Sequence, residues 1–284
     1  MIKVLHAGFY TTVQDFGRIG FQEYGVPYSG VMDRKSAEIA NALLGNSKNE
    51  AVIEMTMTGA KLLFNTATYI VISGADMSAK LNGLAISINK VINIKANDIL
   101  SFGKLHNGFR SYLAVLGGFS APEVMQSKSM YQNITKQIRL NKNDELQIKS
   151  TLKPSLKTNA FLRVDASYIA SNTLSVFKGP EFNELAKDKQ KQLFFKPFTV
   201  SKQNNRMAYQ LEETVTNSLA PIITAPVLPG TVQLTPSGKL IVLMRDCQTT
   251  GGYPRVLQLS KEAINLLSQK FTGCKISLNL ISKF

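Results

Sequence analysis

Most of the chain alternates short apolar runs with polar turns, which is the pattern of β-strands. In the first half the runs are IKVL, AVIEM, AKLLF, TYIVIS, SAKL, LAISI, DILSF and RSYLAVL. In the second half they are FLRV, TLSVF, FTVS, MAYQL, TVQL, KLIVLM, RVLQLS and KISLNLI. The pattern therefore predicts a mainly β protein with a few helices.

Two turns between these runs have a specific chemistry. Asn82-Gly83 separates SAKL from LAISI, and this dipeptide tolerates the positive φ angles of a tight hairpin. Residues 235–238 read TPSG between TVQL and KLIVLM, where the proline presets φ and Gly238 supplies a residue for positive φ. Both sites predict antiparallel hairpins.

Three segments predict helices. Asp33 can cap residues 34–45, because its carboxylate can accept a free N–H of the first turn, and Gly45 suits a left-handed end. A second helix is expected after Ser260, ending at Gly273, and a weaker one over residues 183–194. The inward positions would be Ala37, Ala40, Leu43 and Leu44 in the first helix, and Ala263, Ile264 and Leu267 in the second.

The stretch KSTLKPSLKTN, residues 149–159, is polar and lacks an apolar period, so it predicts a linker. It divides the chain into residues 1–155 and 156–284, each with about eight strands and one or two helices. This arrangement predicts two barrel-like β domains.

The composition supports a folded protein of 284 residues, with 44% hydrophobic and 18% charged residues. The N-terminus lacks the features of a secretory signal, and no apolar run is long enough for a membrane span. The two cysteines, Cys247 and Cys274, favour a reduced cytoplasmic protein without a disulfide framework. With only His6 and His106 beside them, a zinc site is not expected.

The formal net charge is +14, from 33 lysine and arginine residues against 19 acidic ones. Such an excess favours anionic partners, such as a nucleotide, a carboxylate substrate or an acidic protein. The basic residues are scattered, however, and aromatic residues do not alternate with them. A nucleic-acid site is therefore not expected.

The segment QTTGGYPRV, residues 248–256, follows the apolar run KLIVLM after three residues, Arg245, Asp246 and Cys247. Its glycines allow close approach of the backbone, its threonines offer hydroxyls, and its arginine can grip an anion. A tight bend with a packed tyrosine explains the same pattern and is favoured from the residues alone. The candidate binding residues of this segment are Gln248, Thr249, Thr250, Gly251, Gly252, Tyr253 and Arg255.

Other candidates lie at polar turns. Asn205 and Arg206 precede MAYQL, where the arginine could bind a carboxylate or phosphate, or lock a loop through backbone carbonyls. Asp246 follows KLIVLM. Asp33 opens a helix whose N-terminal amides could bind an anion, although a plain helix cap explains it equally well. Motifs of phosphate loops, dinucleotide sites, zinc proteases and serine hydrolases do not occur.

Long blocks of the sequence resemble, in order, the biotin-dependent carboxyltransferase or allophanate hydrolase subunit 2-like family. They are AGFYTTVQDFGRIGFQEYGVPYSGVMD, ISGAD, RSYLAVLGGFSAP, KGPE, NNRMAYQL and PVLPGTVQLTPSGKLIVLMRDCQTTGGYPRV. The resemblance covers nearly the whole chain and implies two cyclophilin-like β-barrel domains. For free-standing bacterial members it implies the role of the C-type subunit in 5-oxoprolinase.

That role implies an ATP-dependent opening of 5-oxo-L-proline to L-glutamate, with magnesium, in a heterocomplex with two further proteins, the B-type and A-type subunits. Under it, Arg206 and Arg255 would bind anionic groups, and the Gly251-Gly252 amides would approach the carbonyl or phosphate, with Asp33 and Asp246 as neighbours. No general base is assigned. Two alternatives remain: a carboxyltransferase component acting on urea or a related amide, and a regulatory protein that sequesters a small inhibitor subunit.

The sequence departs from the family at several positions. Ala208 and Gln210 stand where the family usually has glycine and arginine, QSKSM at 126–130 replaces GSRST, and GGFS at 117–120 replaces GGI-D. The chain lacks a biotinyl-lysine motif and a biotin carboxylase module, so no biotin is expected on it. These features favour the oxoprolinase role over that of a carboxylase part.

Overall fold

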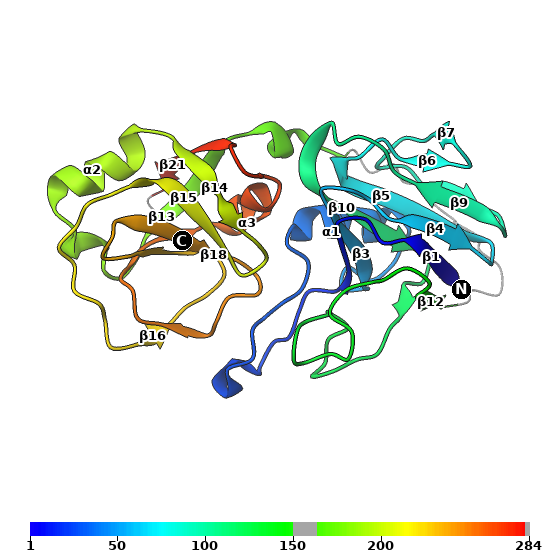
Figure 1. The fold of residues 1–284 in the computed structure, drawn as a ribbon, viewed down its shortest axis with the longest axis horizontal. Coiled ribbons are helices and arrows are strands. Elements are labelled where there is room, and N and C mark those ends of the chain that lie inside the picture. The colour runs from blue at the N-terminus through cyan, green and yellow to red at the C-terminus, as the bar shows by residue number, and fades with distance from the viewer. Residues whose placement is uncertain (150–163, 282–284) are drawn as a thin grey trace. The chain divides into compact units, whose positions relative to one another are not determined.

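The computed structural model describes residues 1–149 and 164–281, which divide into two compact units (Figure 1). The first unit comprises Met1–Arg18 and Ser29–Ala170, and the second comprises Ile19–Tyr28 and Ser171–Phe284. The expected boundary at 155/156 lies outside the described residues, as do most of the expected linker and residues 161–163 of the predicted strand FLRV. They stay predictions.

The first unit contains two β-sheets. A seven-stranded sheet has the order β11-β12-β1-β4-β9-β6-β7, and a five-stranded sheet has the order β2-β3-β10-β5-β8. The strands of the larger sheet are β1 (Ile2–His6), β4 (Lys61–Phe64), β6 (Lys80–Leu81), β7 (Leu84–Ala85), β9 (Asp98–Ser101), β11 (Phe119–Ser120) and β12 (Glu145–Ile148). Those of the smaller sheet are β2 (Tyr10–Gln14), β3 (Val52–Thr56), β5 (Thr68–Asp76), β8 (Ile92–Ile94) and β10 (Asn107–Val115).

One apolar core joins the two sheets of this unit. Alternate side chains of both sheets, such as Ile2, Leu62, Ile53 and Leu113, are fully buried in it. Alternation is expected because successive side chains of a strand point to opposite faces of the sheet. The core therefore explains why the apolar runs of the sequence predicted these strands.

Helix α1 (Arg34–Leu43) packs on β5 and β10 of the five-stranded sheet (Figure 1). Asp33 caps it as predicted, since its carboxylate accepts a hydrogen bond from the Ser36 amide, and Gly45 has a positive φ of 69°. Ala37, Ala40 and Leu44 are buried in a second apolar cluster between helix and sheet.

The second unit is a closed barrel with the strand order β13-β20-β17-β18-β15-β14-β21. Its strands are β13 (Thr173–Lys178), β14 (Phe198–Asn204), β15 (Ala208–Thr214), β17 (Thr231–Leu234), β18 (Lys239–Leu243), β20 (Arg255–Leu259) and β21 (Lys275–Leu280). A two-stranded ribbon of β16 (Ala225–Pro226) and β19 (Thr250–Gly251) accompanies it. The helices of this unit are α2 (Lys187–Phe195) and α3 (Lys261–Ser268), and its 3-10 turns lie at Gln22–Tyr24 and Phe182–Glu184, while a further 3-10 turn at Ser167–Ala170 belongs to the first unit.

The mainly β fold with few helices is confirmed, and so are both predicted hairpins. Asn82 and Gly83 have φ angles of 50° and 86° between β6 and β7, and Gly238 has a φ of 84° between β17 and β18. The predicted end of α3 is wrong, because the helix stops at Ser268 and Gly273 belongs to the turn before β21. None of the helices in the described ranges has the length and apolar content of a membrane span.

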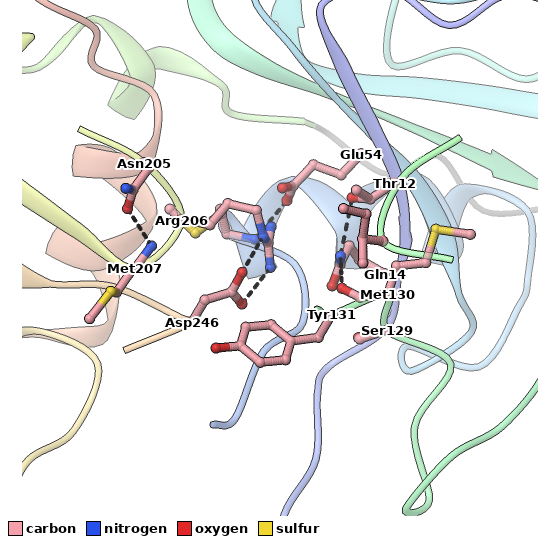
Figure 2. A network of polar contacts seen from close by, with 12 residues as sticks. Thr12, Gln14, Glu54, Ser129, Met130, Tyr131, Asn205, Arg206, Met207 and Asp246 are labelled. Carbon is pink, nitrogen blue, oxygen red and sulfur yellow. Dashed lines mark hydrogen bonds and ion pairs between the residues drawn. The ribbon is translucent and has the colours of Figure 1, made fainter. Parts of the chain in front are cut away.

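Strand β2 was missed because its sequence, YTTVQ, is polar. Thr11, Thr12 and Gln14 are nevertheless buried. The Gln14 amide donates hydrogen bonds to the Thr12 hydroxyl and to the Met130 carbonyl, both at 3.1 Å (Figure 2). Hydrogen bonds inside the protein thus replace those that the Gln14 amide would make with water. A pattern of apolar residues cannot indicate a strand that is buried in this way.

Gly74 and Gly83 offer a matched stability test, because both have positive φ but different surroundings. A Cβ at Gly74 would lie 2.5 Å from the Arg110 carbonyl oxygen, whereas nothing lies within 4 Å of one at Gly83. We expect Gly83→Ala to cost about 1 kcal/mol of backbone strain, and Gly74→Ala about 3 kcal/mol, since overpacking adds to the strain. Urea denaturation of both variants measures the difference, and equal losses would contradict the packing described here.

Candidate functional site

The turn between β14 and β15 holds Asn205 and Arg206. The side-chain oxygen Oδ1 of Asn205 accepts a hydrogen bond from the amide of Met207 at 2.8 Å (Figure 2) and another from the amide of Ala208 at 3.0 Å. Asparagine commonly stabilises turns by bonding backbone amides two residues ahead. The side chain of Asn205 therefore shapes this turn and fixes the backbone that carries Arg206.

Arg206 and Asp246 form a buried, two-pronged ion pair. Nε of Arg206 lies 2.8 Å from Oδ2 of Asp246, and Nη2 lies 3.0 Å from Oδ1 (Figure 2). The Asp246 amide also donates to the Arg206 carbonyl at 2.9 Å. Two nitrogens of the guanidinium group thus each contact one carboxylate oxygen, and Asp246 fixes the orientation of Arg206.

The segment from Thr249 to Gly252 is tied to the chain before β17. Thr250 and Gly251 of β19 pair with Pro226 and Ala225 of β16. The carbonyl of Thr249 accepts from the Val227 amide at 3.0 Å, and that of Gly252 accepts from the Ile222 amide at 2.9 Å. The bend predicted from QTTGGYPRV is therefore a short ribbon rather than an open loop.

A neighbouring side chain explains the glycine at 251. A Cβ there would clash with Nε2 of Gln233. Neither Gly251 nor Gly252 has a positive φ. The sequence suggested that a ligand approaches the backbone at these glycines. At Gly251 the space beside the backbone is instead occupied by the side chain of Gln233.

Gln248 differs from the rest of the segment. Its side-chain oxygen Oε1 is buried and accepts no hydrogen bond from any residue that the structure describes. A buried acceptor without a donor costs about 1–3 kcal/mol. Retaining such a group beside a ribbon of fixed geometry marks Gln248 as the candidate to accept a hydrogen bond from a ligand. Thr250 and Tyr253 are exposed.

Arg255 is matched by a carboxylate that sequence reasoning missed. Its Nη2 lies 2.7 Å from Oε1 of Glu181 and its Nε lies 3.1 Å from Oε2, while Nη1 donates to the Pro226 carbonyl at 3.0 Å. The hydrogen bonds from Arg255 lower the pKa of Glu181, and Glu181 raises the pKa of Arg255. Glu181 lies in the KGPE block, residues 178–181. The resemblance of this block to the family was the one sequence signal that could have indicated Glu181 as a site residue.

The barrel register separates the two arginines. Arg206 precedes β15, whose first residue, Ala208, lies opposite Leu243 at the end of β18. Arg255 begins β20 opposite Gln233, in the middle of β17. The structure thus brings together Asn205, Arg206 and Asp246, and it places Arg255 with Glu181 at another level of the barrel.

Asp33 belongs to a buried cluster of the first unit. Its Oδ2 accepts from the hydroxyls of Ser36, at 2.8 Å, and Tyr168, at 2.5 Å, and its amide donates to the Tyr112 hydroxyl at 2.8 Å. Burial, with the charges of Glu54 and Asp33, raises the pKa of Tyr112. The cap role is confirmed, and both tyrosines were missed because they come from distant parts of the chain.

The candidate residues do not fit a magnesium nucleotide. The guanidinium groups expected to hold phosphates, Arg206 and Arg255, each already carry a carboxylate partner. Within the described residues, no group of three or more histidine, cysteine or acidic side chains could hold a metal ion.

Comparisons with known proteins agree with this architecture. Residues 24–280 match the family model of the carboxyltransferase domain, subdomain A and B. The C-type subunit of 5-oxoprolinase from Escherichia coli is 34% identical over 262 residues, which cover 90% of this chain and 83% of that protein. The urea amidolyase of Lachancea kluyveri is 45% identical over 130 residues, which cover 45% of this chain and 7% of that protein.

A solved structure shows the same fold over nearly the whole chain. The crystal structure of the K. lactis urea amidolyase superposes with a TM-score of 0.87 and 26% identity, covering 99% of this chain and 19% of that one. The chain thus spans about one fifth of that relative. The superposition shows that the two proteins share this fold. The activity in the name of the larger protein is a statement about that protein.

The Arg255–Glu181 pair generates a pH-dependent prediction. Because the pKa of Glu181 is lowered on folding, its contribution to stability is present above its unfolded pKa and is lost as the pH falls through the folded pKa. We expect Glu181→Gln to lower the unfolding free energy by about 1.5–3 kcal/mol at pH 7, with a smaller difference near pH 3. The exposed Glu184→Gln variant is the control, and a loss independent of pH would contradict the ion pair.

Proposed function

Since the chain belongs to the carboxyltransferase domain family, subdomain A and B, we propose that it acts as the C-type subunit of an ATP-dependent 5-oxoprolinase. In this role it opens 5-oxo-L-proline to L-glutamate together with the A-type and B-type subunits in the cytoplasm. The observation that carries the proposal is the 34% identity to the E. coli protein over 90% of this chain.

In this proposal Gln248 binds and orients the substrate. The ring of 5-oxoproline contains a secondary amide, whose N–H donates to the free Oε1 of Gln248. Holding that N–H sets the plane of the amide relative to the ribbon of Thr250 and Gly251. The Arg206–Asp246 pair keeps the adjoining turn in place.

Opening a resonance-stabilised amide needs activation, which ATP would supply. We place the magnesium nucleotide outside the candidate residues of this chain, because their guanidinium groups are matched by Asp246 and Glu181. The proposed contribution of this chain is therefore to bind the lactam and to hold it in position.

A second function is favoured by one observation, the 45% identity to a urea amidolyase over 130 residues. Urea also presents N–H donors to an acceptor such as Gln248. In this case the chain would take part in transferring a carboxyl group to urea or a related amide, supplied by a biotin carrier on another protein.

Reconstitution distinguishes these functions. The purified chain is mixed with the A-type and B-type subunits, and ADP and glutamate are measured with 5-oxoproline. We expect both products to appear only when all three proteins are present. Product formation without this chain would contradict the proposal. Carboxylation of urea with a biotin carrier and biotin carboxylase would favour the second function, and tight binding to the B-type subunit without stimulated ATP consumption would favour a regulatory role.

The role of Gln248 is tested by removing its acceptor. Gln248→Met keeps the length of the side chain but cannot accept the amide hydrogen bond, so we expect kcat/KM for 5-oxoproline to fall by about 10- to 100-fold. N-methyl-5-oxoproline lacks the N–H and should be a poor substrate for the wild type. Against it, the variant should lose little further activity.

Gln192→Met on α2 is the matched control and should retain the wild-type kcat/KM. Equal losses by Gln248→Met on the N–H and N-methyl substrates would show that Gln248 acts without contacting this hydrogen.

A further inference from the structure

The dipeptide Asn-Gly occurs twice in the sequence, as Asn82-Gly83 and as Asn107-Gly108. An asparagine before glycine readily loses its side-chain amide, because glycine has no Cβ to keep its backbone nitrogen away from the asparagine Cγ. Both asparagine side chains are exposed, and both glycines have a positive φ, 86° at Gly83 and 77° at Gly108. Exposure and glycine conformation therefore do not distinguish the two sites, whereas their hydrogen bonds do.

The side chain of Asn107 folds back onto the next peptide group. Its Oδ1 accepts a hydrogen bond from the Gly108 amide at 2.9 Å. Because Oδ1 is bonded to Cγ, this contact holds the Gly108 nitrogen beside the carbon atom that it would attack. Two reacting groups that are already held in contact react faster than groups that must first find each other.

The backbone at Asn107 tolerates a local change. Asn107 is the first residue of β10 (labelled in Figure 1), and the pairing of β10 with β5 is irregular between Asn107 and Ser111. The regular pairing of β10 with β3 begins at Arg110. Gly108 lies in the irregular stretch, so a new bond at its nitrogen does not require regular strand pairing to break.

The side chain of Asn82 is held away from Gly83 by strand β9. Its Oδ1 accepts from the Ile99 amide at 2.8 Å, and its Nδ2 donates to Oδ1 of Asp98, also at 2.8 Å. Hydrogen bonds from the Lys95 amide and from Asn82 lower the pKa of Asp98, which therefore stays ionised at neutral pH. Attack by the Gly83 nitrogen would first require Asn82 to give up a hydrogen bond to a charged group.

We propose that Asn107 is a site of spontaneous covalent modification, at which the Gly108 nitrogen displaces the side-chain amide, while β9 protects Asn82 from the same reaction. The Gly108 nitrogen bonds to Cγ and gives up its proton. The bond between Cγ and Nδ2 breaks, and Nδ2 leaves with that proton as ammonia. Water then opens the succinimide ring at either carbonyl, which yields aspartate or isoaspartate at position 107 without any change of oxidation state.

This modification would destabilise the end of the sheet at which it occurs. Asn107 lies opposite Asp76 of β5 in the strand register. Either product carries a carboxylate, and like charges directly opposite one another on paired strands are unfavourable. Isoaspartate also adds a methylene group to the main chain. We therefore expect Asn107→Asp, which reproduces the aspartate product, to melt at a lower temperature than the wild type.

Peptide mapping by mass spectrometry tests the proposal, because it measures both sites in one sample of the folded chain aged at mildly alkaline pH. We expect Asn107 to react about 10- to 100-fold faster than Asn82, which must lose its hydrogen bond to a carboxylate. In urea the two sites should react at similar rates. Equal rates in the folded chain, faster loss at Asn82, or an equally large difference in urea would overturn the proposal.

Two variants separate the causes. Asp98→Ala removes the charged acceptor of Asn82, so the rate at Asn82 should rise about 10-fold or more. The rate at Asn107 in the same sample should stay unchanged, which is the control against general unfolding. Asn107→Gln keeps an amide but moves it one bond further from the Gly108 nitrogen, so the modification there should stop. An unchanged rate at Asn82 in the first variant, or continued modification at position 107 in the second, would contradict the proposed chemistry.

Discussion

The structure depends on one constraint: a polar group removed from water must find a partner inside the protein. The polar residues of the family-like blocks mostly satisfy one another. Arg206 is matched by Asp246, Arg255 by Glu181, and Asp33 by Ser36 and Tyr168. Among the candidate residues, Gln248 stands out, because its buried Oε1 accepts no bond from the described residues.

This constraint separates supporting residues from those available for binding. From the sequence, Arg206 and Arg255 suggest anion recognition. In the structure each of them makes a two-pronged ion pair with a carboxylate of the protein, so each stabilises its own part of the fold. Arg255 joins β20 to the turn containing Glu181 and to the carbonyl of Pro226. Arg255 thus holds the ribbon through Pro226, and Gln248, which precedes the ribbon in the chain, is the residue proposed to accept an amide N–H.

The sequence predicted those parts of the fold that depend on local chemistry. Apolar alternation indicated most strands, Asn82-Gly83 indicated a hairpin, and Asp33 indicated a helix cap. Strand β2 was missed because Thr12 and Gln14 are buried through hydrogen bonds rather than through apolarity. The site was predicted as a set of residues, but the pairing of Arg255 with Glu181 depends on tertiary contacts between segments 74 positions apart.

The most direct test of this account is a crystal structure of the assembled complex with bound 5-oxoproline. The account predicts the ring nitrogen about 2.7–3.2 Å from Oε1 of Gln248, with Arg206 still on Asp246 and Arg255 still on Glu181. A substrate held by either arginine, with its carboxylate partner displaced and Gln248 remote from the ring, would contradict it.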